Sequence, residues 1–312
     1  MINLDEIEQA VKDHPVQRLA VAVAQSESVL EAVKDAQTRA IADPVLVGEE
    51  REIRQVAEKV GLDLVQAAVI DVADECEAAA RAALEVREGR ADVLMKGHLH
   101  TDDFLRAVLD KERGLRSEHI MSHVFILETT ALNRLTLVTD GAMNIAPDLV
   151  GKANIIMNAV YLARLLGVQR PKVCVLAAVE LVNPNMPATL DAAALAKMND
   201  RGQFPECEVD GPFALDNAVS TLAAEIKRIK SPCAGLGDIL LAPDIESGNI
   251  LAKSFSFLAG GRVAGVLVGA AAPVVLTSRA DTAEAKLYSI ATAVFMAGMK
   301  RDSRLKIGKV HY

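Results

Sequence analysis

Two side chains with complementary chemistry stand next to each other near the end of the sequence. Ser278 and Arg279 follow an apolar run that halts at Thr277, and a charged, helix-prone segment begins directly after them. A serine hydroxyl can donate a hydrogen bond to an oxyanion, and a guanidinium can hold a phosphate through two parallel hydrogen bonds. The structural alternative is that Ser278 or Asp281 caps the next helix and that Arg279 is a surface charge. The pair is a candidate anion site that capping explains nearly as well.

A second group of cationic side chains follows an apolar run at 92–97. Gly97 allows the backbone to approach a ligand closely, and Thr101 or Asp102 can cap the next helix, whose first amides attract anions. The density of positive charge predicts a phosphate site, although the same residues would also serve as loop and surface side chains. The candidate binding residues of this segment are Lys96, His98, His100 and Arg106.

The histidines raise a metal site as an alternative. His98 and His100 alternate onto one face, while His119 and His123 stand four residues apart, a spacing that suits two ligands on a helix. No C-x-x-C pair supports the site, and nothing in the sequence brings the two histidine pairs together. We therefore expect no metal.

Two further polar segments follow apolar runs and lead into helical ones. In VTDGAMNIAPD (138–148) the candidates are Asp140 and Asn144, which either orient a substrate or bond only to their own turn. In LLAPDIESGNILAKSF (240–255) the candidates are Glu246, Ser247 and Asn249, which helix capping explains equally well. The sequence leaves both interpretations of each segment open.

Short apolar runs alternate with longer segments of helical period along the chain. The predicted strands are 19–24, 44–48, 92–97, 123–128, 135–140, 172–179, 238–243 and 263–269, and the predicted helices are 27–41, 49–60, 74–88, 148–166, 187–199, 213–229 and 281–299. This order predicts an α/β fold with mostly parallel strands covered by helices on both faces. Ligands of such sheets bind at the carboxyl ends of strands, which is where the polar segments lie.

The length of 312 residues predicts two lobes, because a single core rarely grows that large. The paired runs at 123–140, interpreted as a hairpin or a change of sheet, mark the expected boundary, and the last long helix returns to the first lobe. We expect one lobe from 1–121 together with 270–312, carrying Ser278 and Arg279, and a second lobe from 122–269.

Composition narrows the class of protein. Hydrophobic residues make up 51% of the chain and the net charge is −8, which predicts a soluble protein without a nucleic-acid partner. The longest apolar run, 263–277, is too short and too interrupted to span a membrane. The acidic N-terminus is unlike a secretory signal, which favours a cytoplasmic location, and four scattered cysteines are typical of free thiols.

The sequence has no G-x-G-x-x-G turn, no Walker A motif and no G-x-S-x-G elbow. Several segments, taken in order, instead resemble the phosphate acetyltransferase and butyryltransferase family, the butyryltransferase branch more closely. They are KGHLHT (96–101), SHVFILE (122–128), VTDGAMNIAPD (138–148), NPNMPATLDAAALAKM (183–198), GPFALDNAVS (211–220), APDIESGNILAKSF (242–255) and PVVLTSRADTAEAKLYSIA (273–291).

The resemblance implies reversible conversion of a short-chain acyl-CoA, above all butyryl-CoA, and inorganic phosphate into acyl phosphate and CoA. Coenzyme A would be a co-substrate, and no tightly bound cofactor is implied. The implied fold has two α/β/α lobes with a central cleft, akin to the isocitrate and isopropylmalate dehydrogenases. The implied assembly is a homodimer or a larger homo-oligomer.

The resemblance also assigns roles to single residues. The family's Ser-Arg pair falls on Ser278, which would contact the reacting carbonyl or thiol, and on Arg279, which would bind phosphate. A second family arginine falls on Arg106. The acetyltransferases carry a candidate catalytic aspartate a few residues after Ser-Arg, and here that position is Ala285. We therefore name Asp281 as the candidate base for the CoA thiol.

Three alternatives remain. The acyl group could be acetyl, because a few side chains of the acyl pocket decide the chain length. The chain could be a metal-dependent dehydrogenase of the same superfold, with His98 and His100 near the metal. A regulatory module that has lost catalysis is the third alternative, although such a module has no need to keep Ser278, Arg279 and Arg106.

Overall fold

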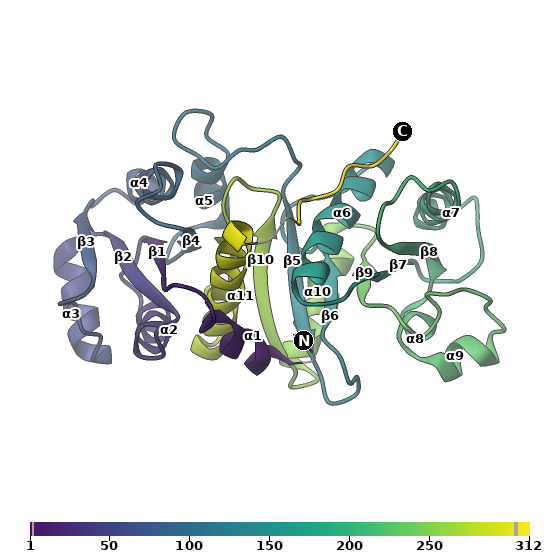
Figure 1. Ribbon diagram of the computed structural model, residues 1–312, viewed down its shortest axis with the longest axis horizontal. Coiled ribbons are helices and arrows are strands. Elements are labelled where there is room, and N and C mark those ends of the chain that lie inside the picture. The colour runs from purple at the N-terminus through teal and green to yellow at the C-terminus, as the bar shows by residue number, and fades with distance from the viewer. Residues whose placement is uncertain (2, 303–304) are drawn as a thin grey trace. The chain divides into compact units, whose positions relative to one another are not determined.

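The computed structural model describes residues 1–312 except 2 and 303–304, and it is an α/β structure, as predicted. The chain divides into two compact units (Figure 1). One unit comprises residues 4–119 and 264–304 and is called the Ser-Arg unit below, because it contains Ser278 and Arg279. The other comprises residues 1–3, 120–263 and 305–312 and is called the central unit.

The helices are α1 (Leu4–Val11), α2 (Glu27–Thr38), α3 (Glu50–Val60), α4 (Glu75–Arg87), α5 (Thr101–Val108), α6 (Leu149–Leu165), α7 (Pro187–Asp200), α8 (Leu215–Val219), α9 (Thr221–Ile226), α10 (Ile245–Phe257) and α11 (Ala283–Asp302). The strands are β1 (Gln17–Ala22), β2 (Ala42–Gly48), β3 (Ala68–Asp71), β4 (Val93–Lys96), β5 (Ser122–Glu128), β6 (Thr136–Thr139), β7 (Lys172–Leu176), β8 (Glu208–Phe213), β9 (Ile239–Leu241), β10 (Arg262–Val268) and β11 (Val274–Val275).

The strands of the Ser-Arg unit follow the order β3-β2-β1-β4-β11-β10. All neighbours are parallel except β10 and β11, which pair antiparallel. All four residues of β4 are buried, as expected for a strand covered on both faces. Helices α2, α3 and α11 pack together, while α4 packs against α5 and three of the strands (Figure 1).

Helix ends in this unit follow familiar capping chemistry. Asp74 begins α4 by accepting a hydrogen bond from the Glu77 amide at 2.8 Å. Gly61 ends α3 in the left-handed conformation at φ +72°, which glycine adopts without a steric penalty. The amphipathic patterns therefore fold into helices with defined ends.

The central unit has the strand order β5-β6-β9-β7-β8. β5 and β6 form the predicted antiparallel hairpin, and the remaining neighbours are parallel. Helix α6 packs against β5, β6 and β9, α7 against β7 and β8, and α10 against β5 and β6. The buried side chains of Leu127, Val138, Cys174, Phe213 and Leu240 belong to one hydrophobic cluster between these elements.

All eight predicted strands form, with ends shifted by a few residues. The prediction missed β3, β8 and β11. β3 and β8 are the outermost strands, where Asp and Gly-Pro interrupt the apolar pattern, and β11 has only two residues. The predicted helix 213–229 divides into α8 and α9, because Ser220 caps α9 by accepting from the Ala223 amide at 3.3 Å.

None of the helices in the described part of the chain is both long enough and apolar enough to cross a membrane. The four cysteines are free: Cys76 is exposed, and Cys174, Cys207 and Cys233 are buried.

Candidate functional site

Three neighbouring parallel strands of the Ser-Arg unit end side by side. Ala22 of β1 is in register with Lys96 of β4, and Val275 of β11 is in register with Met95. The segments that follow these strands therefore meet at one edge of the sheet. This arrangement brings the Lys96-Gly97-His98 segment next to Ser278 and Arg279, as the strand-end argument predicted.

Gly97 makes the close approach of two of these segments possible. Its amide and that of His98 donate to the carbonyl oxygens of Ala22 and Val23, both at 2.8 Å. A Cβ atom at position 97 would lie 2.2 Å from the Val23 oxygen, a distance that no side chain tolerates. The segment after β4 is thus held against the segment after β1.

A cavity of about 110 Å³ lies where these segments meet. This strand-end cavity is lined by Ser26, Ser28, Val29, Gly97, His98, Thr277, Ser278, Arg279 and Lys286. Its lining combines hydroxyls, two cationic side chains and the first turn of a helix. A space of this size has room for a few water molecules or one small anion.

Two features of the lining favour a negatively charged ligand. Ser26 is the N-cap of α2 but makes no side-chain capping bond, so the positive end of this helix borders the cavity. Thr277 is 8% exposed, and its hydroxyl oxygen has no hydrogen-bond partner among the described residues. A buried hydroxyl without a partner costs free energy unless a ligand or water satisfies it.

Two lysines are buried beside the same segments. Lys96 is 3% exposed, and burial, aided by the positive charges of Arg279 and Lys286, lowers its pKa to about 8. Lys286 is 1% exposed, and burial lowers its pKa as well. Buried cations close to one another are destabilising, so an anion that enters the cavity would stabilise their charged forms.

Ser278, Arg279 and Asp281 lie in the short segment between β11 and α11. The Asp281 carboxylate accepts a hydrogen bond from the Ser278 amide at 2.7 Å, and the Ser278 hydroxyl accepts one from the Ala280 amide at 3.3 Å. The cap of α11 is Thr282, whose hydroxyl accepts from the Ala285 amide at 3.1 Å. Capping by Ser278 or Asp281, the structural alternative, is therefore wrong, and Asp281 instead fixes the turn that presents Ser278.

The two histidines of the KGHLHT segment occupy different places. His98 is exposed and lines the strand-end cavity, whereas His100 is exposed at the N-cap of α5 without a side-chain capping bond. Outside residues 2 and 303–304, no group of three or more His, Cys, Asp or Glu side chains gathers in a way that could hold a metal ion.

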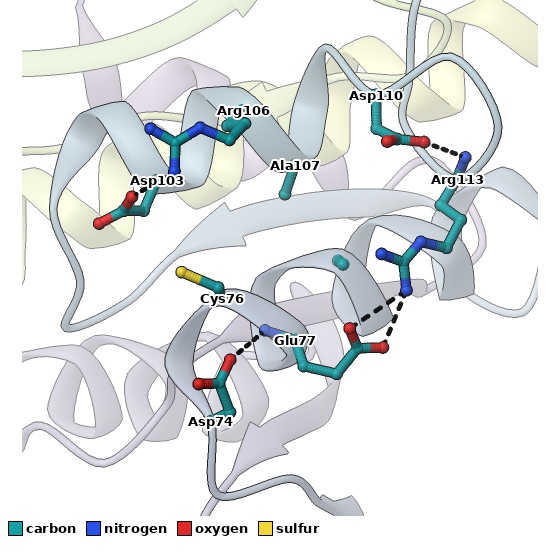
Figure 2. A pocket seen from close by; sticks show the side chains of 9 residues that line it. Asp74, Cys76, Glu77, Asp103, Arg106, Ala107, Asp110 and Arg113 are labelled. Carbon is teal, nitrogen blue, oxygen red and sulfur yellow. Dashed lines mark hydrogen bonds and ion pairs between the residues drawn. The ribbon is translucent and has the colours of Figure 1, made fainter.

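Arg106 lines a different cavity of the same unit, with a volume of about 220 Å³, between α4 and α5. Figure 2 shows its guanidinium beside Asp103, with which it forms an ion pair at 2.9 Å, and shows Arg113 paired with Glu77 at 2.9 Å. The Asp110 carboxylate accepts two backbone hydrogen bonds, which lower its pKa. The charged groups here satisfy one another, and Arg106 is not gathered with Ser278 and Arg279 in the strand-end cavity.

In the central unit, Asp140 and Asn144 follow β6 and bond to their own segment. The buried Asp140 carboxylate accepts from the amides of Ala142, Met143 and Asn144 at 2.9, 3.0 and 3.2 Å. The Asn144 side-chain amide donates to Asp140 at 2.6 Å and to the Met121 oxygen at 2.9 Å. These contacts favour the turn interpretation of both residues over substrate contact.

The three candidates at the start of α10 show the same pattern. Ser247 donates to the N-cap residue Asp244 at 2.7 Å, and Asn249 donates to the Gly141 oxygen at 2.9 Å. Glu246 is exposed in the first turn. Helix capping and loop packing account for Ser247 and Asn249, which links the start of α10 to the segment after β6.

The sequence argument missed four polar residues of the cavity lining: Ser26, Ser28, Thr277 and Lys286. The serines lie two and four residues after the LAVAVA run (19–24), in the same strand-end position that identified the other segments. Lys286 interrupts the apolar side of a helix whose residues 285–297 are all buried, and this break in the pattern is the signal that could have identified it.

Residues 2–81 and 75–294 match the model of the family described as phosphate acetyl/butaryl transferase. The phosphate butyryltransferase of Clostridium acetobutylicum is 47% identical over 298 residues, with 96% of this chain and 99% of the relative covered. The phosphate acetyltransferase of Thermotoga maritima is 46% identical over 279 residues, with 89% and 95% covered. The crystal structure of a branched-chain phosphotransacylase from Enterococcus faecalis V583 has a TM-score of 0.80 and 32% identity, covering 90% of this chain and 99% of that one.

Proposed function

Since this chain belongs to the phosphate acetyl/butaryl transferase family, we propose that it is a phosphate acyltransferase that converts a short-chain acyl-CoA and inorganic phosphate reversibly into acyl phosphate and CoA. The observation that carries the proposal is the strand-end cavity, where Thr277, Ser278, Arg279 and Lys286 meet around a space for a small anion. No covalent intermediate with the protein is needed, because phosphate itself attacks the thioester.

In this proposal the cavity binds the phosphate. Arg279 is exposed at the rim and contacts two phosphate oxygens, while the Thr277 hydroxyl donates to a third. The Ser278 hydroxyl already accepts from Ala280, so its hydrogen is available for the oxyanion that develops on the thioester carbonyl. Held in this way, the attacking oxygen and the carbonyl carbon react as neighbours instead of as separate solutes.

The remaining predicted residues take supporting roles. Lys96 adds positive charge behind the cavity, and His98 borders its opening. His100 and Arg106 lie on α5 or at its start, so any contact they make is with parts of the substrate outside the strand-end cavity. The central-unit loops are shaped by Asp140, Asn144, Ser247 and Asn249, and Glu246 stays a binding candidate.

The proposal extends to the surroundings of the reaction. Coenzyme A is the co-substrate, no cofactor is tightly bound, and the working form is a homodimer or a larger homo-oligomer in the cytoplasm. The lobe of 1–121 with 270–312 supplies the phosphate cavity, and the lobe of 122–269 contributes to binding of the acyl-CoA.

Butyryl-CoA is the proposed preferred substrate, and acetyl-CoA is the second candidate. The relatives bear both names at nearly equal identity, 47% and 46%. One methylene group in an apolar pocket changes the free energy of transition-state binding by about 1–3 kcal/mol, so the preference depends on few side chains.

The test is a thiol-release assay in which kcat/KM is measured for acetyl-, propionyl-, butyryl- and isobutyryl-CoA at a fixed phosphate concentration. We expect release that requires phosphate, with a maximum at butyryl-CoA about tenfold or more above acetyl-CoA. A flat profile would remove the butyryl preference only. No phosphate-dependent release with any of the four substrates would refute the reaction, and metal analysis of the same preparation would then test the dehydrogenase alternative.

A further inference from the structure

Acyl transfer to phosphate requires a proton at the sulfur of CoA, and the candidate for that role from the sequence is already engaged. The Asp281 carboxylate accepts from the Ser278 amide at 2.7 Å. The next position of interest, Ala285, has no titratable group and is 8% exposed. Because one oxygen of Asp281 holds this turn, we look for the proton at another group of the strand-end cavity.

Lys286 stands one position after Ala285, in the first turns of α11, and lines the strand-end cavity together with Ser278, Arg279 and His98. Its ammonium group donates to the main-chain oxygen of Asp281. No carboxylate of the described chain forms an ion pair with it, so its remaining N–H groups are not committed to a permanent anionic partner. The Lys286 side chain thus lies where a proton donor is needed. It is only 1% exposed.

Charged groups from several elements surround Lys286. Lys96 lies at the end of β4, and Arg279 and Asp281 lie in the segment after β11. Glu31 of α2 and Asp281 act to raise the pKa of Lys286, while burial is the larger influence and lowers it. A lysine whose pKa is lowered gives up its proton more readily than an exposed lysine does, which favours proton exchange with a thiol.

We propose that Lys286 is the catalytic residue that exchanges the proton with the sulfur of CoA; the inference rests on the proposed acyl transfer. When acyl phosphate forms, a phosphate oxygen attacks the thioester carbonyl, the carbon–sulfur bond breaks, and the departing sulfur takes a proton from the Lys286 ammonium. The proton that phosphate loses restores the ammonium. In the reverse direction the neutral amine takes the thiol proton, the sulfur attacks the acyl phosphate, the carbon–oxygen bond to phosphate breaks, and the departing phosphate takes the proton from the ammonium.

Lys96 and His98 are the two other groups nearby that could exchange this proton. Lys96 is buried at the end of β4 and is not part of the cavity lining. Its charge influences Lys286, but its side chain does not contact a sulfur bound in the cavity. His98 does line the cavity, but it is exposed, and its backbone amide donates to Val23 in the segment after β1. A His98→Gln variant measured in parallel decides between the histidine and the lysine.

The test compares Lys286→Ala and Lys286→Arg with the matched control Lys300→Ala in the thiol-release assay. Lys300 belongs to the same helix and also donates to a main-chain oxygen, that of Ala271, but it is exposed and outside the cavity. We expect kcat to fall about 100-fold or more in both Lys286 variants, because arginine keeps the charge but does not release its proton. Lys300→Ala should stay within twofold of the wild type.

Rescue by added methylammonium distinguishes a catalytic role of Lys286 from a structural one. Methylammonium should restore a saturable fraction of the rate to Lys286→Ala, whereas tetramethylammonium, which has charge but no proton, should not. Lys286→Met replaces the alanine variant if that protein fails to fold by circular dichroism.

Three results would overturn the inference while leaving acyl transfer intact: a Lys286→Ala rate within threefold of the wild type, full activity in Lys286→Arg, or no rescue by methylammonium. A loss in His98→Gln that methylammonium does not affect, with Lys286→Ala active, would assign the proton to the histidine. An inactive wild type would instead contradict the proposed function.

Discussion

Two pairs of strand ends in this molecule look alike in sequence and differ in how their polar groups are used. β4 and β11 of the Ser-Arg unit, and β6 and β9 of the central unit, are neighbouring parallel strands followed by polar segments. After β6 and β9, Asp140 and Ser247 form hydrogen bonds within their own loops. At the ends of β4 and β11, the buried cations Lys96, which ends β4, and Lys286 of α11 lie beside the polar segments, and the Thr277 hydroxyl has no partner in the described part of the chain.

The difference teaches that residue type and strand-end position identify candidates but do not separate a binding site from a well-capped loop. A network whose donors and acceptors are paired lowers the free energy of the folded protein, whereas buried unpaired groups raise it. The central-unit loops therefore contribute stability. The strand-end cavity costs stability, as expected of a site that awaits a ligand.

The largest expected effect comes from Arg279→Gln. Removing a phosphate-binding guanidinium should lower kcat/KM about 1000-fold, which corresponds to about 4 kcal/mol of transition-state stabilisation. Because Arg279 is exposed, the free energy of unfolding should change by less than about 0.5 kcal/mol. Steady-state kinetics with varied phosphate, together with urea unfolding, measure both quantities. Activity within tenfold of the wild type would contradict the role assigned to this arginine.

In contrast to Arg279→Gln, Asp140→Ala should act mainly on the stability of the protein. The change leaves three backbone amides and the Asn144 side chain without their shared acceptor, so we expect the free energy of unfolding to fall by about 3 kcal/mol. Glu246→Ala is the control in the same unit, with an expected change below about 0.5 kcal/mol. If urea unfolding gives Asp140→Ala the stability of the wild type, the contrast between the two pairs of strand ends does not hold.

Lys96→Met should stabilise the protein at neutral pH. The pKa of Lys96 falls from 10.5 to about 8 on folding, so the unfolded chain binds the proton more tightly. The free-energy cost of burying the charged Lys96 is fully present below pH 8 and decreases as the pH rises from 8 to 10.5. The difference between the two pKa values limits this cost to about 3 kcal/mol. We expect a gain of about 2 kcal/mol at pH 7 that disappears near pH 10.5.

Urea unfolding of Lys96→Met and wild type at pH 7 and pH 10 provides the measurement. A stabilisation that is equal at both pH values would mean that side-chain packing, and not the buried charge, causes it. A loss of stability at pH 7 would mean that the ammonium is satisfied in the folded protein.

Arg106→Gln is expected to have the smallest effect. Its side chain is 74% exposed and paired with Asp103, and exposed ion pairs contribute about 0–1 kcal/mol. We expect a change in unfolding free energy below about 0.5 kcal/mol and a change in KM for phosphate below threefold. A KM increase of tenfold or more would return Arg106 to the phosphate site that the sequence resemblance assigned to it.

Much of the fold could be predicted from the sequence, since alternating apolar and amphipathic segments identified eight of the strands and the α/β class. The short strand β11 could not be predicted, because two residues do not make a pattern. Yet β11 is what places Ser278 beside Gly97. The lysines illustrate a second limit: Lys96 was identified by its strand-end position, whereas Lys286 became a candidate only when the fold turned its side of α11 toward the cavity.

The sequence also could not predict which strand-end loops bind a ligand and which only satisfy their own backbone. Asp140 and Asp281 both looked like ligands or bases at strand ends, and only the geometry shows that each holds backbone amides. The sequence does not reveal which acceptors a carboxylate reaches, because that depends on turns formed by residues two to four positions away.

The central claim is that phosphate binds in the strand-end cavity of the Ser-Arg unit, and a crystal structure of the protein grown with inorganic phosphate tests it most directly. The account predicts tetrahedral density within hydrogen-bond distance of the Arg279 guanidinium and the Thr277 hydroxyl. Phosphate bound beside Arg106, or at the segment that carries Asp140, with the strand-end cavity holding only water, would contradict it.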